Sequence, residues 1–202
     1  MSGFEANPPA IRDKTLVGDA GILYDVLETH TASHGKDPTK PGETVMLLID
    51  AAGRGRLELV ESLLDQGSDV NARTANGSTA LMWASVRGHV DVVELLLSRG
   101  ADIDAQDGDG GTALMEASWE GHVDVVRVLL DNGANADARD VLDMTSLIWA
   151  ARKGHLAVVE ALLEHGADGG ACDIMGKTAL MWATDHGHVS VRDFLLAYLG
   201  RQ

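Results

Sequence analysis

The sequence has only one cysteine, Cys172, and no long run of apolar residues. Without a second cysteine no intramolecular disulfide can form, which argues against a secreted scaffold held together by disulfide bonds. No apolar run approaches the ~20 residues that a membrane-spanning helix needs, so we expect no membrane segment. The first residues also lack the basic patch and the apolar stretch of a signal peptide. We therefore expect a cytoplasmic protein.

Basic residues are scarce as well. The chain of 202 residues has 16 Lys and Arg against 31 Asp and Glu, which gives a formal net charge of −15. Binding to a nucleic-acid backbone depends on Lys and Arg that neutralise phosphates, so we expect no nucleic-acid partner. Hydrophobic residues make up 45% of the chain, which is enough for a buried core. The composition therefore indicates a folded, acidic protein.

Proline is absent after residue 41. Because a proline inside a helix removes a hydrogen bond and clashes with the preceding turn, the remaining chain is well suited to helices. This part of the chain also contains a repeat with a period of 33 residues. Its clearest markers are the Gly-His pairs Gly88-His89, Gly121-His122, Gly154-His155 and Gly187-His188, and the single threonines Thr79, Thr112, Thr145 and Thr178.

Each period predicts two helices. In one unit, Thr79 can cap a first helix over residues 80–87, because its hydroxyl accepts a hydrogen bond from a free N–H of the first turn. Gly88 ends this helix, and a second helix is expected over residues 89–99. The following segment, rich in Asp and Gly, predicts a turn or hairpin. Because so small a unit cannot bury its apolar face alone, we predict an all-α solenoid of stacked units.

The segments Gly77-Ser78-Thr79-Ala80-Leu81, Gly88-His89 and Gly100-Ala101-Asp102 resemble the ankyrin repeat. The resemblance covers residues 44–202 and implies five helix-turn-helix units with hairpin connections. These units lie near residues 44–76, 77–109, 110–142, 143–175 and 176–202. The sequence departs from the family's Thr-Pro-Leu-His motif, and we expect local packing to replace the hydrogen bonds of the missing histidine. The residues at that position are Met82, Met115, Ile148 and Met181.

Residues 1–43 do not follow the register of the repeat. We expect residues 1–12 to be disordered, residues 16–30 to form a capping helix, and residues 31–43 to form a loop that contains two prolines. Terminal repeats are usually atypical because one of their faces meets water.

Several motifs resemble ligand sites but are better explained by the repeat. Equivalent histidines in stacked units lie roughly 8–10 Å apart, whereas each ligand atom of a zinc ion must lie within ~2.1 Å of the metal. We therefore interpret the histidines as anchors of the turn between two helices. Counted from Asp102, the positions at which a calcium-binding loop requires glycine and glutamate hold Asp107 and Ala113. Because the common hydrolase motifs are also missing, we predict no catalytic residue, no metal and no cofactor.

One loop leaves a second function open. Residues 171–178 fit the relaxed pattern of a phosphate-binding loop, with Ala171 in place of its first glycine. No strand is expected before this loop, and Asp173 would repel a phosphate. Nucleotide or phosphate binding through Ala171–Thr178 is therefore an alternative to the main prediction.

The resemblance implies a binding surface for another protein on the concave face, made of the loop tips and the exposed side of the first helices. Mapping this surface onto the chain gives a set of candidate partner-binding residues. They are Val86, Arg87, Trp119, Glu120, Val141, Leu142, Met144, Arg152, Lys153, Ile174, Met175 and His186.

Tryptophan has a repeated position and one exception. Trp83, Trp149 and Trp182 share one helix position, which is typical of packing between repeats. Trp119 lies three residues beyond that position and occurs once, so we hypothesise a groove centred on it. The basic residues expected around this groove are Arg87, Arg152 and Lys153. The alternative is that the apolar loop tips only pack against each other.

The sequence thus predicts a monomeric, non-catalytic protein-interaction module that acts as an adaptor, scaffold or inhibitor. A targeting subunit of an enzyme complex is a further alternative. The mapped face is expected to be nearly neutral, with the acidic residues mainly on the second helices and the remaining segments.

Overall fold

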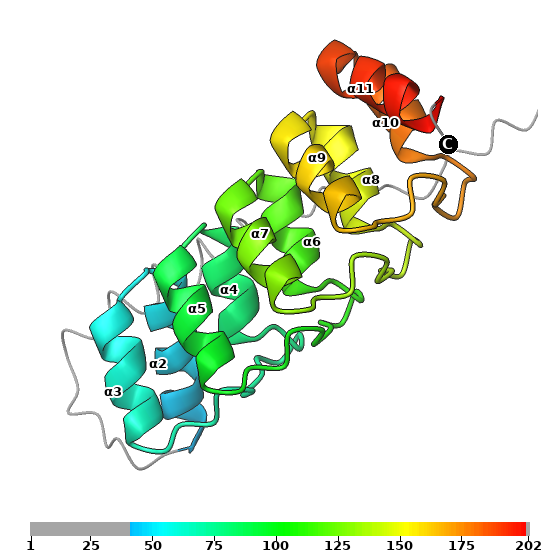
Figure 1. The fold of residues 1–202 in the computed structure, drawn as a ribbon. Helices are drawn as coiled ribbons and strands as arrows, with labels where there is room; N and C mark the ends of the chain where they lie inside the picture. Colours follow the sequence, from blue (N-terminus) through cyan, green and yellow to red (C-terminus); the bar gives the residue numbers. More distant parts are fainter. Residues whose placement is uncertain (1–40, 201–202) are drawn as a thin grey trace, which may run out of the picture. The chain divides into compact units, whose positions relative to one another are not determined.

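The computed structural model describes residues 41–200, with side chains from residue 45 onward. Within this range the chain forms ten α-helices in five pairs (Figure 1). The pairs are α2 (Pro41–Gly53) with α3 (Leu57–Asp65), α4 (Ala80–Val86) with α5 (Val90–Ser98), α6 (Ala113–Glu120) with α7 (Val123–Asp131), α8 (Ser146–Lys153) with α9 (Leu156–Glu164), and α10 (Ala179–Asp185) with α11 (Val189–Leu199). The predicted all-α solenoid of paired helices is confirmed.

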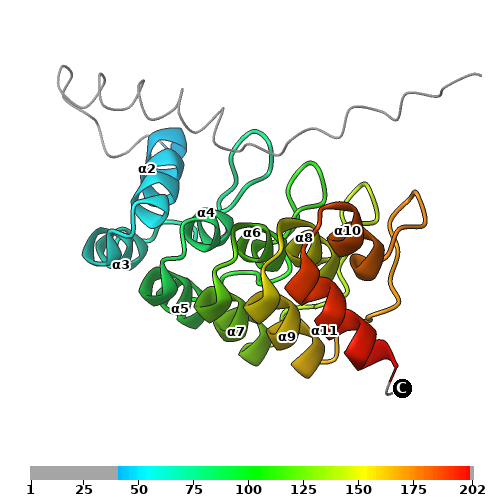
Figure 2. The same ribbon diagram turned by 90° about the horizontal axis from the view of Figure 1, so that it is seen from above.

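The helices of the described range form two rows. The first helices of the pairs pack side by side in the order α2, α4, α6, α8 and α10, and the second helices form a parallel row. Figure 2 shows that the loops between successive pairs project on the side of the first helices. One alanine series in the first helices is completely buried, and such small side chains allow neighbouring helices to approach closely. The series is Ala51, Ala84, Ala117, Ala150 and Ala183.

Threonine caps explain where four first helices begin. Each threonine hydroxyl accepts a hydrogen bond from the N–H three residues later, which satisfies a donor that the helix itself leaves free. The capping residues are Thr79, Thr112, Thr145 and Thr178. The prediction of this cap from the threonine series is therefore confirmed.

The residues that replace the motif histidine are packed in three units. Met82, Met115 and Ile148 are at most 3% exposed, so apolar packing fills this position as expected. Met181 in the last pair is 50% exposed. Helix α10 packs on α8 and α11, and the side that a following unit would cover stays open within the described range.

The four Gly-His turns tie each pair to the preceding one. Each histidine Nε2 lies 2.9–3.1 Å from a carbonyl oxygen at the end of the preceding first helix. Because a carbonyl only accepts, Nε2 must carry the proton. The bonds join His89 to Gly53, His122 to Val86, His155 to Trp119 and His188 to Arg152. The interpretation of these histidines as turn anchors is confirmed.

The N-terminal boundary differs from the expectation. Helix α2 begins at Pro41, so the loop predicted over residues 31–43 is wrong for its last three residues, and the first unit starts earlier than residue 44. Proline suits the first turn of a helix because its missing N–H would have no partner there. The predictions for residues 1–12, for residues 16–30 and for the rest of that loop concern residues outside the described range.

Candidate functional site

One carboxylate organises each of three successive loops. Asp140 Oδ1 accepts hydrogen bonds from the backbone N–H groups of Leu142 and Met144, at 2.8 and 3.0 Å. Asp107 and Asp173 make the same pair of bonds to the N–H groups two and four residues later. These bonds hold each loop in one conformation, because the carboxylate accepts hydrogen bonds from backbone N–H groups of its own turn.

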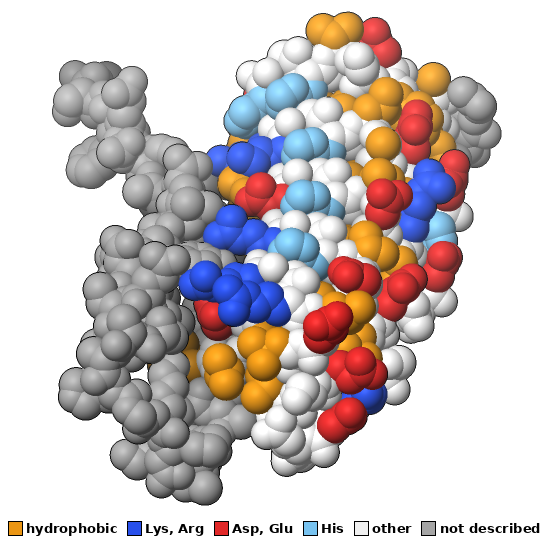
Figure 3. All heavy atoms as spheres, turned by 90° about the vertical axis from the view of Figure 1, so that its left-hand side faces the viewer, with side chains coloured by type: hydrophobic (Ala, Val, Ile, Leu, Met, Phe, Trp, Pro, Cys, Tyr) orange, Lys and Arg blue, Asp and Glu red, His pale blue; other side chains and the backbone are white. Residues whose placement is uncertain are grey.

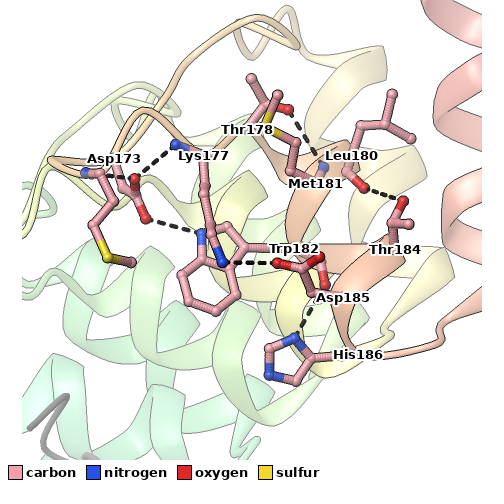
Figure 4. A network of polar contacts seen from close by, with 10 residues as sticks. Asp173, Lys177, Thr178, Leu180, Met181, Trp182, Thr184, Asp185 and His186 are labelled. Atoms are coloured by element: carbon pink, nitrogen blue, oxygen red, sulfur yellow. Dashed lines mark hydrogen bonds and ion pairs between the residues drawn. The ribbon is translucent and has the colours of Figure 1, made fainter. Parts of the chain in front are cut away.

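The second oxygen of two of these carboxylates binds a tryptophan. Trp149 Nε1 donates to Asp140 Oδ2 at 3.1 Å, and Trp182 Nε1 donates to Asp173 Oδ2 at 2.9 Å (Figure 4). Each indole therefore bridges a first helix and its loop. Trp149 is 2% and Trp182 is 5% exposed, and the prediction that the repeated tryptophans pack between repeats is confirmed for this pair.

Trp119 joins these rings from the neighbouring helix α6. Its ring centroid lies 4.7 Å from that of Trp149, and the planes meet at 79°, which is the edge-to-face geometry that aromatic pairs favour. The hypothesis that Trp119 occupies a special place therefore acquires a physical basis. The ring belongs to a surface shared by three successive units.

Cationic side chains lie over these rings. The guanidinium carbon of Arg152 is 4.9 Å from the ring centroid of Trp182, and within 5.6 Å of the other two centroids. Lys153 Nζ lies 3.9 Å from the Trp119 centroid, and Lys177 Nζ lies 4.7 Å from that of Trp182. All are within the range of a cation–π interaction. We call Trp119, Trp149, Arg152, Lys153, Lys177 and Trp182 the aromatic–basic cluster.

Two lysines of the cluster differ in their charge partners. Lys177 Nζ is 2.7 Å from Asp185 Oδ2, and its hydrogen bond and charge lower the pKa of that carboxyl. Lys153 is exposed and, among the residues that the structure describes, its ammonium group has no hydrogen bond and no ion pair. Lys153 thus holds its charge over an indole ring with its N–H donors open to solvent.

Apolar side chains at two loop tips lie next to the cluster. Val141 is 65%, Ile174 56% and Met175 46% exposed, and we call these three the apolar tips. The Ile174 N–H donates to the Leu142 carbonyl at 3.1 Å, so the two loops are joined. Each loop carries its aspartate directly before its apolar tip, and that aspartate binds a tryptophan of the cluster. These exposures speak against the alternative that the tips only pack against each other.

Two of the proposed site residues are wrong. Val86 is 8% exposed and Met144 is 2% exposed, so neither presents its side chain to a partner. Met144 lies where the Asp140 turn ends and its side chain enters the core below α8. Val86 is the last residue of α4, and its carbonyl oxygen accepts the hydrogen bond of His122. At the same repeat position, the longer side chains of Trp119 and Arg152 stay partly exposed.

The four remaining proposed residues lie in three places. Arg87 and Glu120 are exposed at the ends of α4 and α6, at the same repeat position as Lys153. His186 lies beside the cluster, with its ring 5.4 Å from that of Trp182. Leu142 is half-buried between the apolar tips.

Sequence reasoning missed three members of the cluster. The repeat pattern assigns Trp149 and Trp182 only to packing, and it gives Lys177 no role. A usable signal was present: tryptophan follows an aspartate by nine residues in both units. Trp83 has Thr74 at that distance instead, and among the described residues its buried Nε1 has no hydrogen-bond partner.

The loop over Ala171–Thr178 is not arranged to hold a phosphate. The N–H groups of Met175 and Lys177 already donate to Asp173, at 2.8 and 2.9 Å. The Lys177 ammonium group is paired with Asp185. A phosphate would therefore have to displace a carboxylate from the donors that it needs. Within residues 41–200, no cluster of three His, Cys, Asp or Glu side chains is suited to a metal ion, and no helix is long and apolar enough to cross a membrane.

Charge is distributed unevenly over this part of the protein. Figure 3 shows a row of histidines with Lys and Arg side chains gathered on one side of it and Asp and Glu on the other. The five second helices carry ten acidic side chains and only two basic ones, Arg127 and Arg192. The expected concentration of acidity on the second helices is thus found, and the aromatic–basic cluster is a local basic region of an acidic protein.

Protonation of His155, which binds the Trp119 carbonyl, is expected to destabilise the protein. Burial lowers the pKa of this ring below its ordinary value of 6.5 and outweighs the opposite effect of the Trp119 hydrogen bond. The folded state therefore binds the proton less tightly than the unfolded chain. The stability that the neutral ring contributes is present above that value and is lost as the pH falls below it. We expect the urea concentration at the unfolding midpoint to decrease when the pH is lowered from about 8 to about 5.5.

A variant isolates this effect from that of other histidines. Hydrogen bonds to the Ala161 carbonyl and to Asp131 raise the pKa of the exposed His165, so that residue acts in the opposite direction. His155→Gln is expected to show a smaller loss of stability on acidification than the wild type. Equal pH dependence of both proteins would contradict the assignment to His155.

Comparison with known families agrees with this architecture. A family model described as ankyrin repeats (3 copies) matches residues 47–140 and 136–202. No curated protein matches the chain. The matched residues contain every helix from α3 to α11 and therefore the whole aromatic–basic cluster.

Proposed function

The chain belongs to the ankyrin-repeat family, whose domains are generally protein-interaction modules, and we propose that it is a non-catalytic adaptor, scaffold or inhibitor. Its partner protein would bind on the face formed by the first helices and the loops. The aromatic–basic cluster together with the apolar tips is the observation that carries this proposal. Tryptophan and arginine are the residue types most enriched among side chains that dominate binding energy.

The construction of this face supports tight binding. Asp140 and Asp173 fix the two loops from within, and three indole rings hold Arg152 in place. A surface that is ordered before binding loses little conformational entropy when the partner arrives. The exposed apolar tips add surface that a partner can remove from water.

The test compares proteins captured from a cell extract by immobilised wild type and variants. Truncation in Trp119→Ala removes the ring under Lys153 and beside Trp149, so we expect capture of the specific partner to fall at least about tenfold. Leu142→Ala is expected to weaken capture less, since its side chain is half-buried. Mass spectrometry identifies and quantifies the captured proteins.

Two controls make the result interpretable. Leu196→Ala truncates a side chain that is 53% exposed on α11, and it should leave capture unchanged. Trp119→Phe keeps an aromatic ring and should retain most of the binding. Capture that survives both Trp119→Ala and Leu142→Ala would show that this face is not the binding site. The monomeric state stays a prediction, which sedimentation of the purified chain would check.

A further inference from the structure

We infer that the partner segment bound by this face is an acidic peptide stretch, in which an Asp or Glu carboxylate binds Lys153 while a nearby apolar side chain contacts the apolar tips. This inference rests on the proposed protein-binding function and specifies the chemistry of the partner. It follows from the position of Lys153 over Trp119 and from the exposed apolar tips on the loops that bind Trp149 and Trp182.

Lys153 carries the first step. Its ammonium group lies 3.9 Å from the Trp119 centroid, its side chain is exposed, and no carboxylate of the described residues pairs with it. The indole face interacts with the positive charge but accepts no strong hydrogen bond from it. The N–H donors therefore remain available, and a carboxylate forms short, charge-assisted hydrogen bonds with such donors.

The neighbouring cations supply the second step. Arg152 lies among three indole rings, and Lys177 lies over one of them, so both side chains are already held in one place. A cation that is ordered beforehand loses less side-chain entropy when it approaches an anion. Arg152 and Lys177, held over these rings, add to the positive charge of Lys153, although Asp185 neutralises part of it.

The acidic second helices add selectivity. Their ten carboxylates oppose the approach of a uniformly negative molecule, while the basic region attracts a segment whose negative charge is localised. A short acidic stretch meets the positive potential without crossing the negative one. Attraction and repulsion together therefore orient the partner segment on the face of the first helices.

The apolar tips favour a peptide over a nucleic acid. Single-stranded nucleic acids stack their bases on exposed aromatic faces, but Trp149 and Trp182 are 2% and 5% exposed and lie beneath cationic side chains. Phosphate backbones also require several unpaired cations, whereas Lys177 is paired with Asp185. Val141, Ile174 and Met175 instead offer contact for an aliphatic side chain next to a carboxylate.

The experiment is the selection of short random peptides, displayed from a library, on the immobilised full-length chain. We expect the peptides that bind the wild type to be enriched in Asp and Glu next to an aliphatic residue. Their affinity should fall about tenfold in Lys153→Glu, because the variant replaces attraction with repulsion. Selection on Lys153→Glu itself should lose the acidic preference.

The control is Arg127→Glu, which makes the same change of net charge on α7. Arg127 is exposed on a second helix, so the variant should bind the selected peptides as the wild type does. Equal weakening by both variants would show that only net charge matters, and it would overturn the assignment of the carboxylate to Lys153. Binding of a single-stranded oligonucleotide that depends on Lys153 would overturn it as well.

The outcomes separate this inference from the proposed function. If the selected peptides require Trp119 but show no excess of Asp and Glu, the acidic partner is wrong and the binding face stands. If no peptide is selected, or if the selected peptides bind Trp119→Ala as well as the wild type, both proposals fail. Enrichment of acidic peptides that depend on both Trp119 and Lys153 supports both.

Discussion

Replacing Asp140 with alanine is expected to lower the free energy of unfolding by about 3–5 kcal/mol, because it leaves three donors without an acceptor. Those donors are the backbone N–H groups of Leu142 and Met144 and the indole N–H of Trp149. Asp140 is 4% exposed, so water cannot readily replace the carboxylate. Chemical denaturation followed by circular dichroism measures the change.

Two comparisons test whether the hydrogen bonds are responsible. Asp140→Asn keeps one oxygen for the loop but exchanges the acceptor of Trp149 for a donor, and it should cost about 1–2 kcal/mol. Asp109→Ala removes an exposed loop carboxylate and should change stability by less than about 0.5 kcal/mol. A loss below about 1 kcal/mol in Asp140→Ala would contradict the role assigned to this carboxylate.

The loss of the loop bonds should also affect the binding face. The Asp140 turn holds Val141 at the tip, and Trp149 bridges the same turn to α8 beneath Arg152. Any population of Asp140→Ala that remains folded is therefore expected to bind partner peptides more weakly. Asp107 makes the equivalent two bonds to backbone N–H groups of its own loop. We therefore expect the Asp107 loop to stay intact in Asp140→Ala.

Gly121→Ala is expected to destabilise the protein by about 3 kcal/mol, the sum of backbone strain and a displaced ring. Gly121 has φ +83°, a conformation that costs a residue with a Cβ about 1–2 kcal/mol. A Cβ at this position would also lie only 2.6 Å from Nδ1 of His155. The ring would have to move away, and its hydrogen bond to the Trp119 carbonyl would break.

The last repeat supplies a matched control. Gly187 occupies the equivalent position with φ +72°, but a Cβ there meets nothing within 4 Å among the described residues. Gly187→Ala should therefore show the backbone cost alone, about 1–2 kcal/mol. The difference between the two variants measures the contact between successive units. If both variants lose the same stability, the histidine ring does not constrain the glycine.

Both predictions concern contacts that repeat along the chain. In a stack of repeats, stability is close to a sum of the stability of each unit and of the interfaces between neighbours. Gly121→Ala acts on the contact between two helix pairs, since His155 precedes α9 and binds the end of α6, whereas the bonds of Asp140 join one loop to the helix α8 that follows it. We therefore expect Gly121→Ala to broaden the unfolding transition more, because it weakens the coupling between units.

The sequence by itself determined the repeated architecture. The 33-residue period, the threonine caps and the Gly-His turns predicted helix pairs and their stacking, because each of these signals acts on the backbone within a few residues. The turn-anchoring role of the histidines followed from the same period. Within the described residues, the first unit starts earlier than predicted, at Pro41, where the register of the repeat is weak.

Only the tertiary structure decided which candidate residues form the surface. Val86, Trp119, Arg152 and Asp185 share one repeat position, yet Val86 is buried, Trp119 and Arg152 are partly exposed, and Asp185 is exposed. The exposed fraction of each side chain depends on neighbours about 33 residues away in the sequence, whose size and charge differ from unit to unit. Arg152 shows this most directly, since its guanidinium contacts tryptophans from three successive units. The period fixes where a side chain begins, and packing against the neighbouring units fixes what it touches.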